Sequence, residues 1–314
     1  MSNLLSSRKY PRIAPLLIAF FLTLFYTVNG YARPDMTPLG PNIADKGSAY
    51  YHFSVSTFDS ADGRRHYKVW TGVPDKSAPP SGYPVLYLLD GNAAMDKLSE
   101  PVLKQLSAGT PPIIVAVGYQ TPLPFEVNAR AYDYTPPVRE SHHQDLHGRE
   151  NGGAQVFRHL LEKTIVPGVE KGLKIDPAKR GLWGHSYGGV FVLDTYLSSS
   201  SLFSRYYSTS PSLNRDYAVL VDRLGEIKKA DFCNKSLSLY EGDDTPGKNI
   251  KSETAPEVLL KLRNTLAALH NQGLPVSYWS DPLLSHGQMF NASLPRALLN
   301  IAAEQQGNLK STCP

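Results

Sequence analysis

The run Gly184-His185-Ser186-Tyr187-Gly188-Gly189 constrains the fold more than any other feature of these 314 residues. It matches G-x-S-x-G, and it lies between a strand-like stretch, 180–183, and a helix-like stretch, 190–197. A serine hydroxyl becomes a useful nucleophile when a sharp turn exposes it next to a base and to donors that stabilise an oxyanion. Glycines on both sides permit that turn because they carry no Cβ. The run therefore predicts a strand–turn–helix elbow with Ser186 as the candidate nucleophile.

The rest of the chain alternates between strand-like and helix-like stretches after an initial pair of strands. The stretches 85–89 and 113–117 are continuously apolar, as strands buried on both faces are. This pattern predicts an α/β fold, an open and mostly parallel twisted sheet with helices on both faces. The expected strands are 51–58, 66–73, 85–90, 113–119, 181–185, 206–210, 236–240 and 276–280, and the expected helices are 93–107, 155–170, 190–197, 217–228, 255–271 and 288–303.

Residues 1–32 have the pattern of a secretory signal peptide. Three basic residues precede an apolar stretch, 13–28, and Gly30 and Ala32 occupy the small-residue positions of a cleavage site. An uncleaved membrane anchor is the alternative, although this stretch contains Pro15 and is shorter than the ~20 residues that a span needs. We expect cleavage, with residues 33–314 forming one exported domain.

Charge and cysteine content exclude several classes of function. Residues 1–32 contain three of the 32 basic side chains and no acidic ones, so their removal lowers the formal net charge from +4 to +1. That balance gives no indication of binding to nucleic acid or to an anionic membrane. In an oxidising compartment, Cys233 and Cys313 are expected to form a disulfide, although spacing alone does not show that they meet. The histidines near 142–147 lack the spacing of a zinc site, so we expect no metal and no cofactor.

The base of a serine hydrolase of this topology follows the last strand. His286 lies between the last expected strand and the last expected helix, and the chain order of serine before histidine also agrees. The orienting acid is open. Glu241 and Asp243 follow the strand 236–240, Asp281 is close to His286 in sequence, and a Ser–His dyad without an acid is a further alternative.

The expected oxyanion hole uses main-chain N–H groups from two loops. Tyr187 supplies one, and Gly91 or Asn92, after the strand 85–90, supplies the other. The second loop could equally be an ordinary helix cap. The segment 120–153 has no helical or alternating period, and we expect it to be an irregular functional loop. Its arginines, Arg130, Arg139 and Arg149, could hold an anionic ligand or keep the loop soluble.

Several of these segments together resemble the periplasmic trilactone siderophore esterases of the IroE type, within the esterase D-like branch of the α/β-hydrolases. The resemblance spans about residues 40–305 and rests on 87–94, 130–136, 184–189, 208–212 and 286–291. It implies a single α/β-hydrolase domain over 33–314, located in the periplasm of a Gram-negative bacterium. It also implies that Ser186 and His286 act as nucleophile and base. The loop that carries the candidate acids varies among members of this family.

The resemblance further implies that Arg130 lies near the substrate, and we place Tyr132, Tyr134 and Asn92 around it. A ferric tris-catecholate carries about three negative charges and planar rings, which an arginine fork and aromatic faces can bind.

The expected function is therefore hydrolysis of the ester bonds of a catecholate trilactone siderophore such as enterobactin or salmochelin, ferric or iron-free, for iron release or siderophore processing. The partner is this small molecule, with no nucleic acid, and no membrane unless residues 1–32 are retained. One alternative is a general carboxylesterase of the esterase D type that acts on feruloyl or thioester substrates. Another is a non-catalytic ferric-siderophore binding protein.

Overall fold

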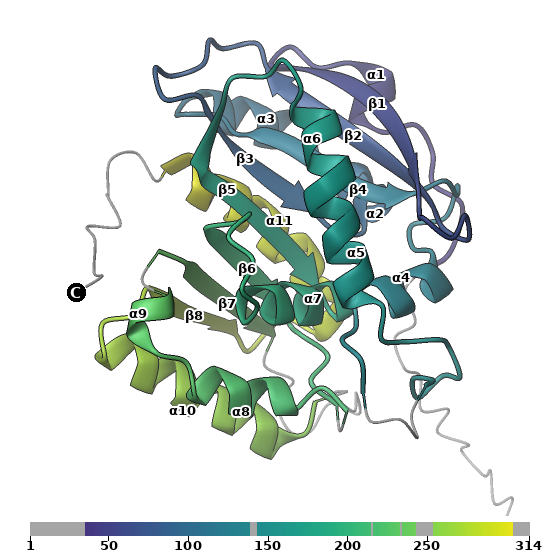
Figure 1. Ribbon diagram of the computed structural model, residues 1–314. Helices are drawn as coiled ribbons and strands as arrows, with labels where there is room; N and C mark the ends of the chain where they lie inside the picture. Colours follow the sequence, from purple (N-terminus) through teal and green to yellow (C-terminus); the bar gives the residue numbers. More distant parts are fainter. Residues whose placement is uncertain (1–34, 139–142, 215, 233, 243–253, 304–314) are drawn as a thin grey trace, which may run out of the picture.

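The computed structural model describes residues 35–138, 143–214, 216–232, 234–242 and 254–303. At its centre is one eight-stranded sheet (Figure 1). The strands are β1 (Tyr51–Asp59), β2 (His66–Pro74), β3 (Tyr83–Leu88), β4 (Ile113–Tyr119), β5 (Ile175–His185), β6 (Arg205–Thr209), β7 (Ser236–Gly242) and β8 (Val276–Asp281). Their order across the sheet is β1-β2-β4-β3-β5-β6-β7-β8. Strand β2 is antiparallel to both of its neighbours, and every pair from β4 to β8 is parallel.

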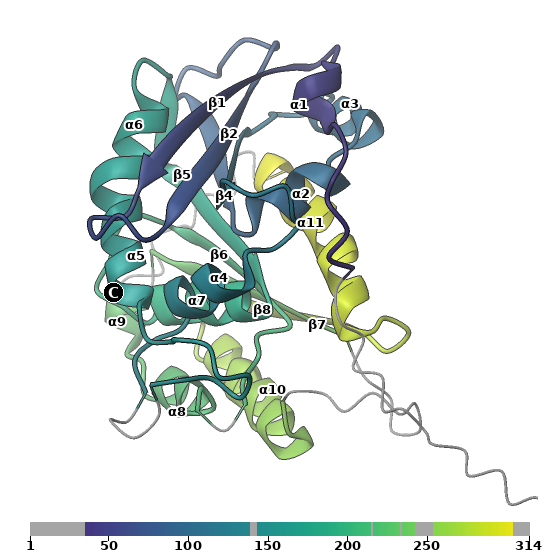
Figure 2. The same ribbon diagram turned by 90° about the vertical axis from the view of Figure 1, so that its right-hand side faces the viewer.

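Alternate side chains of the central strands enter two separate cores. Val85 and Tyr87 pack into one core, and Leu86 and Leu88 into the other, because successive side chains of a strand point to opposite faces. The helices are α1 (Ile43–Lys46), α2 (Gly91–Lys97), α3 (Glu100–Ser107), α4 (Val127–Asp133), α5 (Ala154–Leu160), the π-helical η1 (Leu161–Ile165), α6 (Val166–Glu170), α7 (Tyr187–Tyr196), α8 (Val219–Gly225), α9 (Lys229–Phe232), α10 (Pro256–Asn271) and α11 (His286–Ala303). Helices α2, α3 and α11 cover one face of the sheet, and α5, α6, α7, α8 and α10 cover the other (Figure 2).

The predicted fold class and all eight predicted strands are confirmed, although β5 begins at Ile175 rather than at 181. The predicted helix 93–107 is two helices, because Leu98 and Ser99 have extended backbone between α2 and α3. Pro101 lies in the first turn of α3, where its missing N–H costs nothing. The predicted helix 155–170 is confirmed, with the π turn η1 in its middle.

The prediction of an irregular segment over 120–153 is wrong in its middle, where α4 lies. The Glu126 carboxylate accepts the N–H of Asn128 and so caps the start of α4. At the other end, the N–H of Gly153 donates to the carbonyl of Tyr132 at 2.9 Å. Helix α4 shows no clear apolar period because two of its inward-facing residues, Arg130 and Asp133, are charged.

Several predicted features lie outside the described residues. These are the signal segment 1–32, Asp243, Cys233 and Cys313, together with Arg139. Among the helices that the structure does describe, none is long and apolar enough to cross a membrane.

Candidate active site

The elbow around Ser186 has the predicted sharp turn. Ser186 has φ 60° and ψ −118°, a conformation that L-residues rarely adopt, and it is partly exposed between β5 and α7. A Cβ on Gly184 would lie 2.4 Å from the carbonyl oxygen of Gly188, and one on Gly189 would lie 2.7 Å from that of Thr209. Both positions therefore require glycine, and the turn holds the serine at the carboxyl edge of the sheet.

His286 lies beside this elbow as the first residue of α11. The ring of His185, which precedes the nucleophile, donates a hydrogen bond from Nε2 to the main-chain carbonyl of His286 at 2.7 Å. The two imidazole rings have centroids 4.7 Å apart. Burial, and then the neighbouring His286, lower the pKa of His185 well below its ordinary value. His185 is therefore a neutral donor that fixes the loop carrying the candidate base, a role that the sequence did not indicate.

Ser212 is a second polar neighbour that the sequence reasoning missed. Its hydroxyl lies 2.9 Å from the Ser186 hydroxyl, and its side chain is fully buried. Ser212 follows β6 in a tight turn where Ser210 has a positive φ of 37°. The run 208–212 was notable in sequence only as part of a resemblance, since nothing in its composition indicated a contact with the nucleophile.

The two predicted oxyanion donors, Gly91 and Tyr187, begin α2 and α7 at the ends of the neighbouring strands β3 and β5. N–H groups in the first turn of a helix have no acceptor within that helix. A Cβ on Gly91 would lie 2.6 Å from main-chain atoms of Val117 and Gly118, so only glycine lets α2 begin this close to β4. The stabilisation of an oxyanion by these two N–H groups stays a prediction.

Arg130 lies beside the elbow and is paired within the protein, and its place near the substrate stays a prediction. Its guanidinium forms a fork on the Asp90 carboxylate, at 2.8 Å from Nε to Oδ1 and 2.9 Å from Nη2 to Oδ2. The same Nη2 donates to the carbonyl of His185 at 3.4 Å. Only 11% of the side chain is exposed. Burial alone would lower the pKa of Arg130, but Asp90 outweighs it, so the net shift is upward and Arg130 stays charged.

The structure buries two of the other three residues predicted to contact the substrate. Tyr134 is 0% exposed, and its hydroxyl accepts the N–H of Asp90 at 3.1 Å, so its ring offers no face to a ligand. The Asn92 side chain is buried and bonds the main chain of Tyr119 and Thr121 through three hydrogen bonds. The ring of Tyr132 is half-buried beneath the Arg65 guanidinium, 4.4 Å from its centroid. Tyr134 therefore serves packing, whereas Tyr132 lines the pocket described below.

The orienting acid is not assigned. Asp243 lies outside the described residues, whereas Glu241 is buried near the end of β7. The adjacent Gly242 lies against the loop that leads to His286, where a Cβ on it would be 2.5 Å from the carbonyl oxygen of Leu284. Within the described residues, no cluster of three or more His, Cys, Asp or Glu side chains could hold a metal ion.

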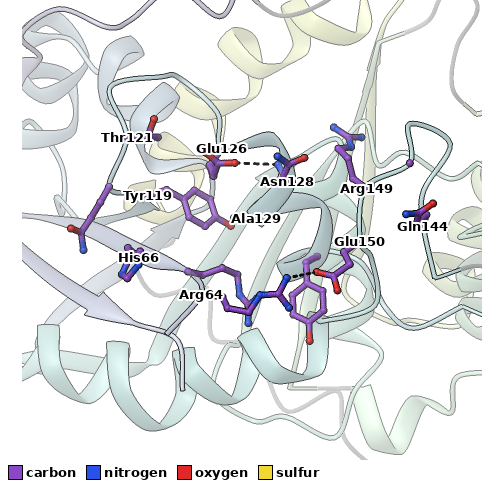
Figure 3. A pocket seen from close by; sticks show the side chains of 14 residues that line it. Arg64, His66, Tyr119, Thr121, Glu126, Asn128, Ala129, Gln144, Arg149 and Glu150 are labelled. Atoms are coloured by element: carbon purple, nitrogen blue, oxygen red, sulfur yellow. Dashed lines mark hydrogen bonds and ion pairs between the residues drawn. The ribbon is translucent and has the colours of Figure 1, made fainter. Parts of the chain in front are cut away.

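A pocket of about 480 Å³ opens beside α4, between the β1–β2 turn and the segment 144–150 (Figure 3). Its three arginines are already paired, Arg64 with Glu150 at 3.0 Å, Arg65 with Asp62 at 3.1 Å and Arg149 with Asp145 at 2.6 Å. Arg149 also lies 5.4 Å from the ring centre of Tyr187. The pocket therefore lies next to the residues that pack around the elbow. Neighbouring carboxylates neutralise the positive charges of its arginines.

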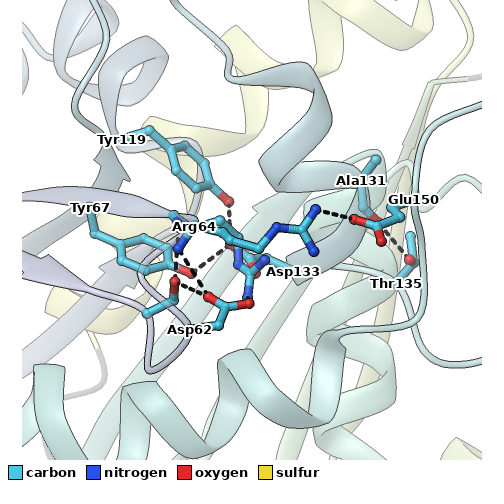
Figure 4. Close-up of polar contacts among 10 residues, drawn as sticks. Asp62, Arg64, Tyr67, Tyr119, Ala131, Asp133, Thr135 and Glu150 are labelled. Atoms are coloured by element: carbon cyan, nitrogen blue, oxygen red, sulfur yellow. Dashed lines mark hydrogen bonds and ion pairs between the residues drawn. The ribbon is translucent and has the colours of Figure 1, made fainter.

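Beneath this pocket, Asp133 anchors the end of α4 to the sheet (Figure 4). One oxygen of its buried carboxylate accepts the hydroxyls of Tyr67, from β2, and Tyr119, from β4, at 2.9 and 3.0 Å. The other oxygen lies 3.1 Å from Nε of Arg65. Burial is the main cause of a rise in the pKa of Asp133 to about 7, which these partners only partly oppose.

Comparison with known proteins agrees with this geometry. A family model described as "Putative esterase" matches residues 60–259. The chain belongs to this esterase family. The esterase is 55% identical over 306 residues to the apo-salmochelin esterase of Escherichia coli O6:H1 (strain CFT073), covering 95% of each chain. It is 35% identical over 257 residues to the ferri-bacillibactin esterase BesA of Bacillus subtilis (strain 168), covering 78% of this chain and 87% of the relative.

Solved structures extend the comparison to three dimensions. The enterobactin and salmochelin hydrolase IroE is 53% identical to this esterase and aligns with a TM-score of 0.74, covering 84% of this chain and all of that one. The predicted α/β-hydrolase fold is thereby confirmed, and so is the prediction of a serine esterase. A binding protein without catalytic activity is correspondingly disfavoured.

Proposed function

We propose that this esterase hydrolyses the ester bonds of a catecholate trilactone siderophore of the enterobactin and salmochelin type. The observation that carries the proposal is the 55% identity to an apo-salmochelin esterase over almost the whole of both chains. The strained, partly exposed Ser186, which follows a histidine whose ring contacts His286, supports the same chemistry. The substrate is taken either with or without its iron.

In the proposed mechanism, the Ser186 hydroxyl attacks a lactone carbonyl carbon while His286 accepts the hydroxyl proton. The main-chain N–H groups of Tyr187 and Gly91 donate to the oxyanion of the tetrahedral intermediate. Its collapse releases the serine hydroxyl of the opened ring, which takes the proton from His286. A water molecule, deprotonated by His286, then attacks the acyl-enzyme and returns the Ser186 hydroxyl. Opening the ring weakens iron chelation because the three catechols lose their preorganisation.

Product analysis tests the proposal. Purified residues 33–314 are incubated with enterobactin, with and without ferric iron, and linear trimer, dimer and monomer are separated by chromatography. We expect these products from the wild type and none from Ser186→Ala. The matched control is Ser56→Ala, which removes an exposed hydroxyl from β1 and should retain full activity. Rapid turnover of small activated esters without any cleavage of enterobactin would contradict the substrate and favour a general carboxylesterase.

We also propose export to the periplasm, on the basis of the signal-like pattern in residues 1–32. The protein recovered from the periplasmic fraction should begin at Arg33, which intact mass measurement can establish. A chain of full mass in the membrane fraction would instead favour a retained anchor.

A further inference from the structure

Phe125 is an aromatic residue near the elbow that stays partly exposed. It lies two residues before the start of α4, and the centre of its ring is 5.5 Å from the guanidinium carbon of Arg130, one turn into the helix. Packing between these two helix positions fixes the direction in which the chain enters a helix. Phe125 therefore has a set orientation, although part of the residue remains accessible to a ligand.

A series of ring contacts connects Phe125 to the elbow. Its ring meets that of Phe290 edge to face, with centres 6.0 Å apart. Phe290 lies one turn after His286 in α11 and meets the ring of His185 in the same way at 5.5 Å. His185 precedes Ser186, and its ring centre is 4.7 Å from that of His286. Phe125 therefore lies on the side of the elbow that carries the candidate base.

Phe125 differs from the other two rings that lie against Arg130. The ring centres of Tyr134 and Tyr187 are both 5.6 Å from the guanidinium carbon, but these residues are only 0% and 4% exposed. The hydroxyl of each is also bonded within the protein. Phe125 has no polar atom in its side chain, so its accessible part can contact only an apolar surface favourably.

Leu283 presents a second apolar side chain next to the candidate base. It is 82% exposed, the largest value among the exposed large apolar residues of the described segments. The turn between β8 and α11 is fixed by Asp281, whose carboxylate accepts the N–H of Leu283 at 2.9 Å and whose carbonyl accepts that of Leu284 at 3.3 Å. Leu284 packs against the same core as Phe125. A single exposed leucine is common, but this one is held on a fixed turn three residues before His286.

We propose that Phe125 and Leu283 form an aryl-binding surface beside His286, which contacts the apolar face of a catechol ring of the substrate. The proposal rests on the siderophore substrate given above. A catechol carries its oxygens at one edge, whereas its ring faces are apolar and favour offset or edge-to-face contact with another ring. Neither side chain carries a charge or a hydrogen-bonding group. The surface therefore binds ferric and iron-free forms alike, and it acts on substrate binding rather than on the chemical step.

The test compares enterobactin, ferric and iron-free, with vinyl acetate, an ester that has no ring. Steady-state kinetics are measured for the wild type, Phe125→Ala and Leu283→Ala. We expect the ratio of kcat/KM for enterobactin to that for vinyl acetate to fall roughly tenfold in Phe125→Ala and about threefold in Leu283→Ala, through a higher KM for enterobactin. Phe125→Tyr keeps the ring and should restore this ratio to within about twofold of the wild type.

Binding of the ring alone is measured separately, with 2,3-dihydroxybenzamide as a competitive inhibitor of vinyl acetate hydrolysis. Its inhibition constant should rise by a similar factor in Phe125→Ala. Phe53→Ala is the matched control, since Phe53 is a partly buried residue on the edge strand β1. Leu260→Ala is the control for Leu283, since Leu260 is 58% exposed on α10. Both controls should keep the kcat/KM ratio and the inhibition constant of the wild type.

An unchanged ratio and an unchanged inhibition constant in both Phe125→Ala and Leu283→Ala would overturn the proposal. An equal loss of kcat on both esters would also overturn it, because that result would indicate a disturbed elbow rather than a lost contact with the ring. If the wild type leaves enterobactin intact, the substrate proposed above fails, and inhibition by 2,3-dihydroxybenzamide still decides whether this surface binds a ring.

Discussion

Asp133 predicts an unusual dependence of stability on pH. Burial raises its pKa from 3.8 to about 7 in the folded protein, and Arg65 and the hydroxyls of Tyr67 and Tyr119 offset only part of that rise. Between about pH 4 and pH 7 the folded state therefore keeps a proton that the unfolded chain has released. Stability must fall as pH rises through this window, which is opposite to the behaviour of a carboxylate whose pKa is lowered by a salt bridge.

The magnitude follows from the pKa of Asp133 in the folded and in the unfolded chain. A tenfold change in an acid dissociation constant corresponds to about 1.4 kcal/mol, so the Asp133 contribution should weaken by roughly 2–3 kcal/mol from pH 5 to pH 8, most of it before pH 7. Asp133→Asn keeps an oxygen that can accept both tyrosine hydroxyls but has no proton to lose. The free energy of unfolding is measured for both proteins by urea titration across this range, and their difference cancels the other titrating groups.

The expected result is a difference in unfolding free energy that moves by roughly 2–3 kcal/mol in favour of the Asp133→Asn variant between pH 5 and pH 8. Asp35→Asn is the control, because hydrogen bonds, first from the Thr37 hydroxyl, lower the pKa of Asp35 below its ordinary value of 3.8. Its titration is complete below pH 5, so the difference in unfolding free energy between this variant and the wild type should not change between pH 5 and pH 8. A flat difference for Asp133→Asn as well would refute the raised pKa and the reasoning from burial.

Three further substitutions test the site and its supports. Ser212→Ala should lower kcat about five- to tenfold with KM unchanged, because it removes one hydrogen bond of about 1 kcal/mol that orients the nucleophile; an unchanged kcat in steady-state assays would contradict this role. Gly184→Ala should lower Tm by roughly 5–10 °C, or prevent folding, because its Cβ meets the Gly188 carbonyl; a melting curve like that of the wild type would show that the elbow can relax. Asn92→Ala should cost about 2–4 kcal/mol in urea unfolding, because buried main-chain groups of β4 lose their partners; a loss below about 0.5 kcal/mol would mean that water replaces the amide.

The strands were predictable because burial on both faces leaves a continuous apolar run. In 85–89, successive residues alternate between the two cores, as in a strand that is covered on both faces. The positions of Ser186 and His286 followed from the same topology. Parallel strands end at one edge, so residues that are 100 positions apart can meet in the loops there.

The environment of α4 could not be predicted in this way. The tyrosines at 132 and 134 are compatible with a ligand-binding loop and with a packed core, and composition does not distinguish the two. The partner of Arg130 is Asp90, 40 residues earlier, and no local pattern records such a pairing. Arg130 was therefore interpreted as a contact for a ligand, and its pairing with Asp90 was not foreseen.

That compensation bears on how the site can stabilise negative charge. His185 is neutral because burial lowers its pKa, and the charge of Arg130 is matched by that of Asp90. Neither residue then adds a full net positive charge next to Ser186, so an oxyanion there would depend on N–H groups held at fixed positions. Such groups act through geometry, and an error of a few tenths of an ångström weakens them. The positive φ values at Asp90 and Ser186 are consistent with that demand, because each places the following N–H at the start of a helix. The bonds that hold these two strained residues should therefore matter more to kcat than the overall charge of the pocket.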